Sequence, residues 1–244
     1  MRADPPGLRR ERNLGAIIGD SFSLLFGHWG GLARIVAPAV LVNVAVGLLA
    51  YAVEDDEALS GVLLVAALPV QLVAFQLVSA AAVAGLNSRD QGGEIDSGAA
   101  LDSAQERFGD VVGASLRATG IVVLLSLTLI GIPWAIKRLV KWAFIIQSII
   151  VDGQEGEPSL AYSESMVEER WWITFGRLVA SGLVVGLPVV IVSQAILLTV
   201  PGVLGIIASH IPDFLALPYG IITSTLIYFD LKTRKARHDS ISTA

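Results

Sequence analysis

The stretch Ala58–Ser88, ALSGVLLVAALPVQLVAFQLVSAAAVAGLNS, contains no Asp, Glu, Lys or Arg. A helix needs about 20 apolar residues to cross the roughly 30 Å of hydrocarbon in a bilayer, so this stretch is long enough for one span with its ends. Three further uncharged stretches occupy residues 35–53, 118–136 and 178–212. The last is too long for one crossing, and Pro201 lies where two spans would separate. The pattern predicts a polytopic membrane protein.

The composition supports the same class. Of 244 residues, 54% are apolar and only 16% are charged, and the mean hydropathy is +0.68. Soluble domains carry roughly a quarter charged residues, so the chain has too few charges to cover a water-exposed surface. This composition excludes a disordered or collagen-like chain and argues against a water-soluble enzyme. The absence of cysteine excludes disulfides and thiolate chemistry, and a net charge of −5 argues against a nucleic-acid partner.

These features predict an all-α membrane bundle in which one domain, residues 14–231, lies between basic tails at 1–13 and 232–244. Basic residues near span ends favour the cytoplasm, which places both tails there and requires an even number of spans in a multi-pass plasma-membrane protein. The acidic run Glu54–Glu57 fits an outer loop. The expected spans lie near residues 33–53, 63–85, 113–132, 134–151, 173–198 and 204–229.

Three segments before the first, third and fifth spans have apolar residues at helical spacing, which predicts amphipathic helices at the cytoplasmic interface. The segments align with one another. Ser21 precedes Trp29 by eight residues, and the same spacing joins Ser103 to Val111 and Ser163 to Trp171. The alignment favours an internal repeat of one interfacial helix followed by a two-span hairpin; chance similarity between amphipathic helices is the alternative.

The third segment and its neighbours also resemble a known bacterial pattern. The matching residues are Leu160–Val167, Arg170–Trp172 with Gly176, Trp142–Gly153 and Thr223–Lys232. They are similar to the membrane domain fused to some glycerophosphoryl diester phosphodiesterases and to its stand-alone relatives. Those relatives tend to have basic residues where this chain has Glu164, Glu168 and Glu169. Because this sequence lacks the soluble phosphodiesterase barrel, the resemblance implies a six-span helical domain and no phosphodiesterase activity.

No catalytic motif is found. The chain has no H-E-x-x-H, no G-x-S-x-G, no phosphate-binding glycine loop, and only three histidines. His28 with Asp20, and His210 with Asp213, could bind a metal or move a proton, but two ligands are too few for a metal site. We therefore expect a non-enzymatic protein without a metal or cofactor, and interpret both pairs as solvated helix ends.

The most informative residues are Lys137, Arg138 and Lys141 in the fourth expected span. Three charges at a lipid-facing helix centre would cost roughly 8–10 kcal/mol, while the apolar residues of the segment return about 5. The side chains must therefore extend to the headgroups or be paired within the protein, or else line a cavity as a site for an anionic solute or lipid headgroup.

Uncharged polar residues inside the spans could line a path or join helices by hydrogen bonds. The candidates for a path are Gln147, Gln194 and Asn43. Gly182 and Gly186 would let the fifth span approach a neighbour closely. The function expected first is a membrane domain that organises lipids or partner proteins, with the bilayer, a membrane protein or a second copy as partner. The alternative is a small permease that uses Lys137, Arg138 and Lys141.

Overall fold

Helices account for all the regular structure in residues 7–242, the part of the chain that the computed structural model describes. This confirms the predicted all-α class. The elements in chain order are α1 (Leu14–Gly27), α2 (Trp29–Ala52), α3 (Glu57–Asp90), α4 (Ser97–Glu106), α5 (Phe108–Ser126), α6 (Ile132–Lys141), α7 (Ile145–Asp152), α8 (Pro158–Val167), the 3-10 turn η1 (Glu168–Arg170), α9 (Trp171–Thr199), α10 (Gly202–Ser209) and α11 (Asp213–Ser242).

A short helix precedes each long helical pair. The side chain of Asn13 begins α1 by accepting from the Ala16 N–H at 2.8 Å, and Asp96 begins α4 in the same way. After a break of one to three residues, α1 continues as α2, α4 as α5, and α8 as α9. The three expected amphipathic segments are therefore helices, in the expected order relative to the long ones.

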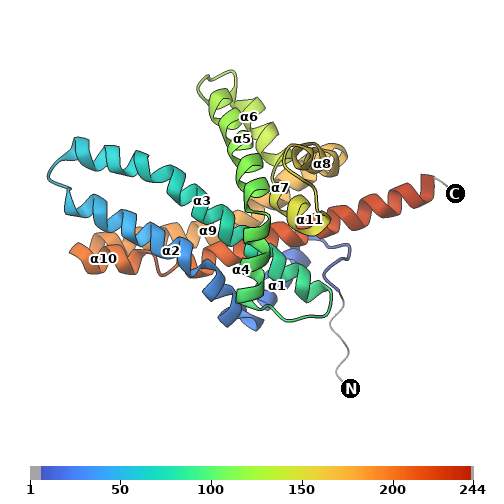
Figure 1. Cartoon of the computed structure of the whole chain (residues 1–244), viewed down its shortest axis with the longest axis horizontal. Coiled ribbons are helices and arrows are strands. Elements are labelled where there is room, and N and C mark those ends of the chain that lie inside the picture. The colour runs from blue at the N-terminus through green and yellow to red at the C-terminus, as the bar shows by residue number, and fades with distance from the viewer. Residues whose placement is uncertain (1–6, 243–244) are drawn as a thin grey trace.

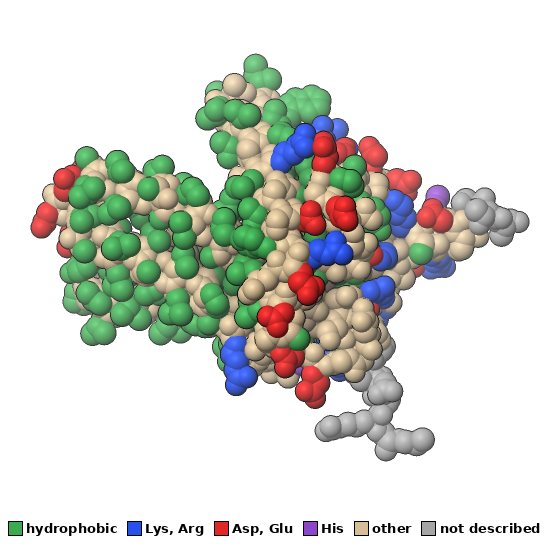
Figure 2. Space-filling view, in the orientation of Figure 1, with side chains coloured by type: hydrophobic (Ala, Val, Ile, Leu, Met, Phe, Trp, Pro, Cys, Tyr) green, Lys and Arg blue, Asp and Glu red, His purple; other side chains and the backbone are tan. Residues whose placement is uncertain are grey.

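The long helices α2, α3, α9, α10 and α11 lie lengthwise together, whereas the α5–α6 hairpin leaves this bundle at a steep angle (Figure 1). The middle of α11 forms the centre of the core, where Tyr219, Ile222 and Phe229 are fully buried. The tip of the hairpin is apolar and exposed at Leu127, Leu129 and Ile130. Apolar side chains cover the two projecting arms of the molecule, which are the outer parts of α2 and α3 and the α5–α6 hairpin (Figure 2). Apart from a few acidic side chains at one tip, the charged side chains gather at the base, the part nearer the two termini.

Within the described residues, five helical segments are long and apolar enough to cross a membrane: Trp29–Ala52, Glu57–Asp90, Phe108–Ser126, Pro158–Thr199 and Gly202–Ser240. The fourth span expected at residues 134–151 is not among them, because it divides into α6 and α7. The hydroxyl of Ser163 bridges this break, donating to the Lys141 carbonyl at 2.8 Å and accepting from the Phe144 N–H at 3.3 Å. The break is therefore stabilised by a residue of α8.

The two expected tails are structured where the structure describes them. Residues 232–242 continue α11 as helix, and Leu8 and Arg12 are buried against the base of the bundle. The Leu8 N–H donates to Asp90 at 2.6 Å, at the end of α3. Residues 1–6 and 243–244 of the predicted tails lie outside the described part.

The close approach of helices occurs at a glycine other than the two predicted ones. Among the described residues, a methyl group at Gly182 or Gly186 of α9 would meet no atom within 4 Å, so neither glycine is required for a helix contact within the chain. At Gly31 of α2, in contrast, a methyl group would lie only 2.8 Å from the carbonyl oxygen of Ile95. The close approach is therefore made between the start of α2 and the segment before α4.

We expect Gly31→Ala to lower the free energy of unfolding by about 1–3 kcal/mol, because backbone rather than a flexible side chain blocks the added methyl group. Gly30→Ala is the matched control, since nothing lies within 4 Å of a methyl group there. Denaturation with SDS in detergent micelles, followed by circular dichroism, measures both. Equal stability of the two variants would contradict the packing at Gly31.

Candidate functional site

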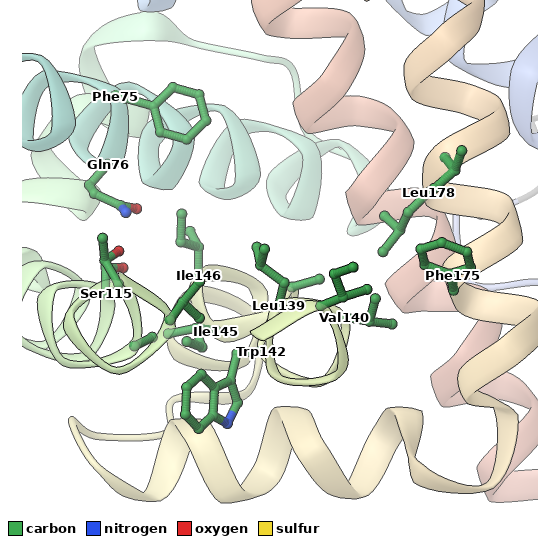
Figure 3. A pocket seen from close by; sticks show the side chains of 16 residues that line it. Phe75, Gln76, Ser115, Leu139, Val140, Trp142, Ile145, Ile146, Phe175 and Leu178 are labelled. Carbon is green, nitrogen blue, oxygen red and sulfur yellow. The ribbon is translucent and has the colours of Figure 1, made fainter. Parts of the chain in front are cut away.

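An apolar cleft of about 640 Å³ lies between the α5–α6 hairpin and the bundle (Figure 3). Its size falls in the range of about 300–1,000 Å³ that is typical of ligand sites. Five helices and the break after α6 contribute side chains to its walls. The labelled residues are Phe75 and Gln76 of α3, Ser115 of α5, Leu139 and Val140 of α6, Trp142 of the break, Ile145 and Ile146 of α7, and Phe175 and Leu178 of α9.

Few polar groups interrupt the apolar walls. Figure 3 shows the Gln76 amide directed toward Ser115 across the cleft. The Gln76 carbonyl oxygen is buried and accepts no hydrogen bond within the described residues. A buried acceptor of this kind costs free energy unless a partner satisfies it. The cleft thus suits a ligand that is mostly apolar and leaves one polar position available near Gln76.

The predicted basic cluster lies at the base of the hairpin, where α8 supplies carboxylates. The Lys141 ammonium lies 2.5 Å from Glu164 and 3.4 Å from Glu168, and the Arg138 guanidinium lies 2.9 Å from Glu164. The hydrogen bond to Glu164 raises the pKa of Lys141 above its ordinary value, and burial opposes it only in part. The charges of Arg138 and Lys141 are therefore paired within the protein.

A second hollow of about 800 Å³ adjoins the cleft, because Ile136 and Phe175 line both. Lys137 belongs to this hollow, and its ammonium lies 5.6 Å from the centre of the Trp134 ring. Its other charged lining residues come from η1: Glu168, Glu169 and Arg170. Within residues 7–242, Lys137, Glu169 and Arg170 form no ion pair, in contrast to the paired side chains beside them.

An aromatic wall closes the hollow on the side of α9. Trp171 stacks on Phe175 with ring centres 5.3 Å apart, and Trp172 meets Trp171 edge-on at 4.6 Å. The Trp171 indole N–H donates to the Lys137 carbonyl at 3.3 Å, which fixes α6 against α9. Tryptophan at the meeting of apolar and charged surface is typical of a membrane–water interface.

The three polar residues predicted to line a path do not line the cleft or the hollow. The amide of Gln147 on α7 donates to the Ser224 hydroxyl of α11 at 3.1 Å, a bond that joins two helices. Gln194 is exposed on α9, and Asn43 is half-buried on α2. The structure does not bring these side chains together.

The histidine pairs are also separated from the cleft. His210 lies 2.9 Å from Asp213 at the break between α10 and α11, as the spacing predicts. His28 instead approaches the Leu24 carbonyl at 3.2 Å, while Asp20 binds the guanidinium groups of Arg10 and Arg12. His28 and Asp20 therefore have different partners.

The sequence did not reveal the acidic partners of the basic cluster. Glu164 and Glu168 are separated from Lys141 by 23 and 27 residues, and the turn after α7 brings them together. The available clue to this pairing was the opposite charge of the fourth expected span and of the amphipathic segment that follows it.

No family model, curated protein or solved structure matches this chain. The resemblance to the membrane domain of glycerophosphoryl diester phosphodiesterases therefore stays a prediction. The functional argument rests on the cleft and the hollow themselves.

Proposed function

We propose that the protein is a non-enzymatic membrane domain that holds a single lipid molecule, with an acyl chain in the cleft between the α5–α6 hairpin and the bundle. The observation that supports the proposal is that an apolar site and a charged site are continuous with each other. The apolar cleft and the charged hollow share Ile136 and Phe175 as walls. A lipid has the same division into an apolar chain and a charged head.

The cleft also favours a ligand that arrives from the bilayer. Part of its wall belongs to α3, α5 and α9, whose outer surfaces expose many large apolar side chains. Burial of apolar surface stabilises a bound chain by about 25 cal/mol per Å². The permease alternative has less support, because Arg138 and Lys141 are already paired with Glu164 and so attract an anion less strongly.

The proposal predicts that the purified protein retains lipid in detergent and loses it when the cleft is filled. Thr119→Trp places an indole in the cleft from an exposed position on α5. Native mass spectrometry should find about one lipid per wild-type chain. Most chains of the variant should carry no lipid.

Val123→Trp is the matched control, because Val123 is exposed on the same helix and does not line the cleft. It should retain lipid like the wild type. Equal lipid retention by Thr119→Trp and Val123→Trp, with both variants folded, would exclude the cleft as the lipid site. A wild-type protein that carries no lipid would exclude the proposed function itself.

A further inference from the structure

The charges around the second hollow indicate what kind of headgroup it takes. On the basis of the proposed lipid-binding function, we propose that the hollow binds a zwitterionic headgroup with a phosphate and a primary ammonium, of the phosphoethanolamine class. Lys137 and Arg170 would bind the phosphate, and Glu169 would bind the ammonium.

The first argument is the balance of charge. Two basic side chains, Lys137 and Arg170, line the hollow together with two carboxylates, Glu168 and Glu169. A purely anionic headgroup would satisfy the bases but would bring its negative charge close to both carboxylates. Like charges repel strongly where part of the surroundings has a low dielectric constant. A headgroup with both signs satisfies both sets of side chains.

The second argument is which charges are available. Glu168 lies 3.4 Å from Lys141, so part of its charge is compensated inside the protein. Among the described residues, Lys137, Arg170 and Glu169 have no ion-pair partner. Lysine and arginine bind phosphate oxygens through charge-assisted hydrogen bonds, and a carboxylate accepts the same kind of bond from a primary ammonium. The uncompensated side chains therefore match the two charged groups of the headgroup.

The third argument separates a primary ammonium from a quaternary one. Choline is recognised by aromatic faces that surround the cation. Here Trp171 stacks against Phe175 with only 4° between the ring planes, and its indole N–H is bound to the Lys137 carbonyl. The stacked pair of Trp171 and Phe175 therefore supports α6 instead of surrounding a cation. A carboxylate, in contrast, prefers a cation that can donate N–H bonds.

The position of the hollow agrees with this assignment. Ile136 and Phe175 separate the charged side chains from the apolar cleft, so a headgroup in the hollow leaves its acyl chain beside the cleft entrance. The hollow also lies where the apolar residues Pro133 and Ile136 of α6 face the charged residues of η1. A headgroup prefers such a junction of apolar and charged surface, as found at a membrane–water interface.

The test is competition among headgroups with identical acyl chains. The full-length protein is reconstituted in vesicles with equal amounts of phosphatidylethanolamine, phosphatidylcholine and phosphatidylglycerol, and then extracted into detergent. Mass spectrometry of the retained lipid should show phosphatidylethanolamine enriched about tenfold over phosphatidylcholine, the ratio expected from one charge-assisted hydrogen bond.

Variants assign the two charges separately. Glu169→Gln should remove the preference for phosphatidylethanolamine while lipid is still retained. Replacing both Lys137 and Arg170 by Gln should lower retention of all three lipids. Glu155→Gln is the control, because Glu155 is exposed and does not line the hollow.

The outcomes separate this proposal from the one on which it rests. Retention of phosphatidylglycerol above phosphatidylethanolamine would overturn the zwitterionic assignment in favour of an anionic headgroup. Equal retention of the three lipids would overturn any headgroup recognition by the hollow and leave lipid binding in the cleft intact. Complete absence of retained lipid in the wild-type protein would instead overturn lipid binding itself.

Discussion

Replacing Asp230 of α11 by alanine is expected to lower the free energy of unfolding by about 3–5 kcal/mol, because the buried Arg12 N–H and two partly buried guanidinium groups lose their acceptor at once. The carboxylate is fully buried. It accepts from the Arg177 guanidinium, from the Arg234 side chain at 2.9 Å, and from the backbone N–H of Arg12 at 2.5 Å. Removing one member of such a network leaves uncompensated positive charge in the interior.

Denaturation with SDS, followed by the fluorescence of the five tryptophans, measures the effect. Asp102→Ala is the control, because Asp102 is exposed on α4 and should change stability by no more than about 0.5 kcal/mol. A change in Asp230→Ala as small as in the control would show that the three arginines do not depend on this carboxylate.

Glu164→Ala should be the next most destabilising substitution, with a loss of about 3 kcal/mol, because it leaves Lys141 buried without its nearest partner. The Lys141 side chain is only 10% exposed, whereas that of Glu164 is 28% exposed. The partial exposure of Glu164 places the expected loss at the lower end of the range for buried pairs. The same substitution frees Arg138, which has water nearby and loses less.

The double variant with Lys141→Met and Glu164→Ala tests this reason. Methionine fills the space without a charge, so the double variant should be more stable than Glu164→Ala alone. Lys141→Met by itself should lower stability less than Glu164→Ala does, since Glu164 remains paired with Arg138. If the two substitutions are additive, the buried ammonium is not the source of the instability.

The membrane class and the helical pattern could be predicted because they depend on local composition. Stretches without charge mark the long helices, and apolar residues at helical spacing mark α1 and α4. Such signals lie within one element, so no knowledge of its neighbours is needed. The same reasoning located the two halves of the segment 178–212, which break at Val200 and Pro201 as expected.

The divided fourth span could not be predicted, because its cause lies in another helix. Residues 134–151 are apolar enough to suggest one helix, yet Ser163 of α8 binds the two backbone groups exposed at the break. Likewise, the cost of burying Lys141 depends on Glu164, which the sequence displays only as part of a polar face. The hollow that contains Lys137 and Arg170 exists only after α6 and η1 have met.

The network around Asp230 also sets an order of assembly during synthesis. Asp230 binds Arg12 across 218 positions of the chain, and the Arg12 carbonyl accepts from Arg177 and Arg234. The residues before α1 are synthesised before α9 and α11, yet the groups that hold them belong to those two helices. The nascent chain must therefore insert its earlier helices before this contact can form, and contacts between distant positions close slowly. The segment before α1 therefore waits for α11 before its backbone has this partner.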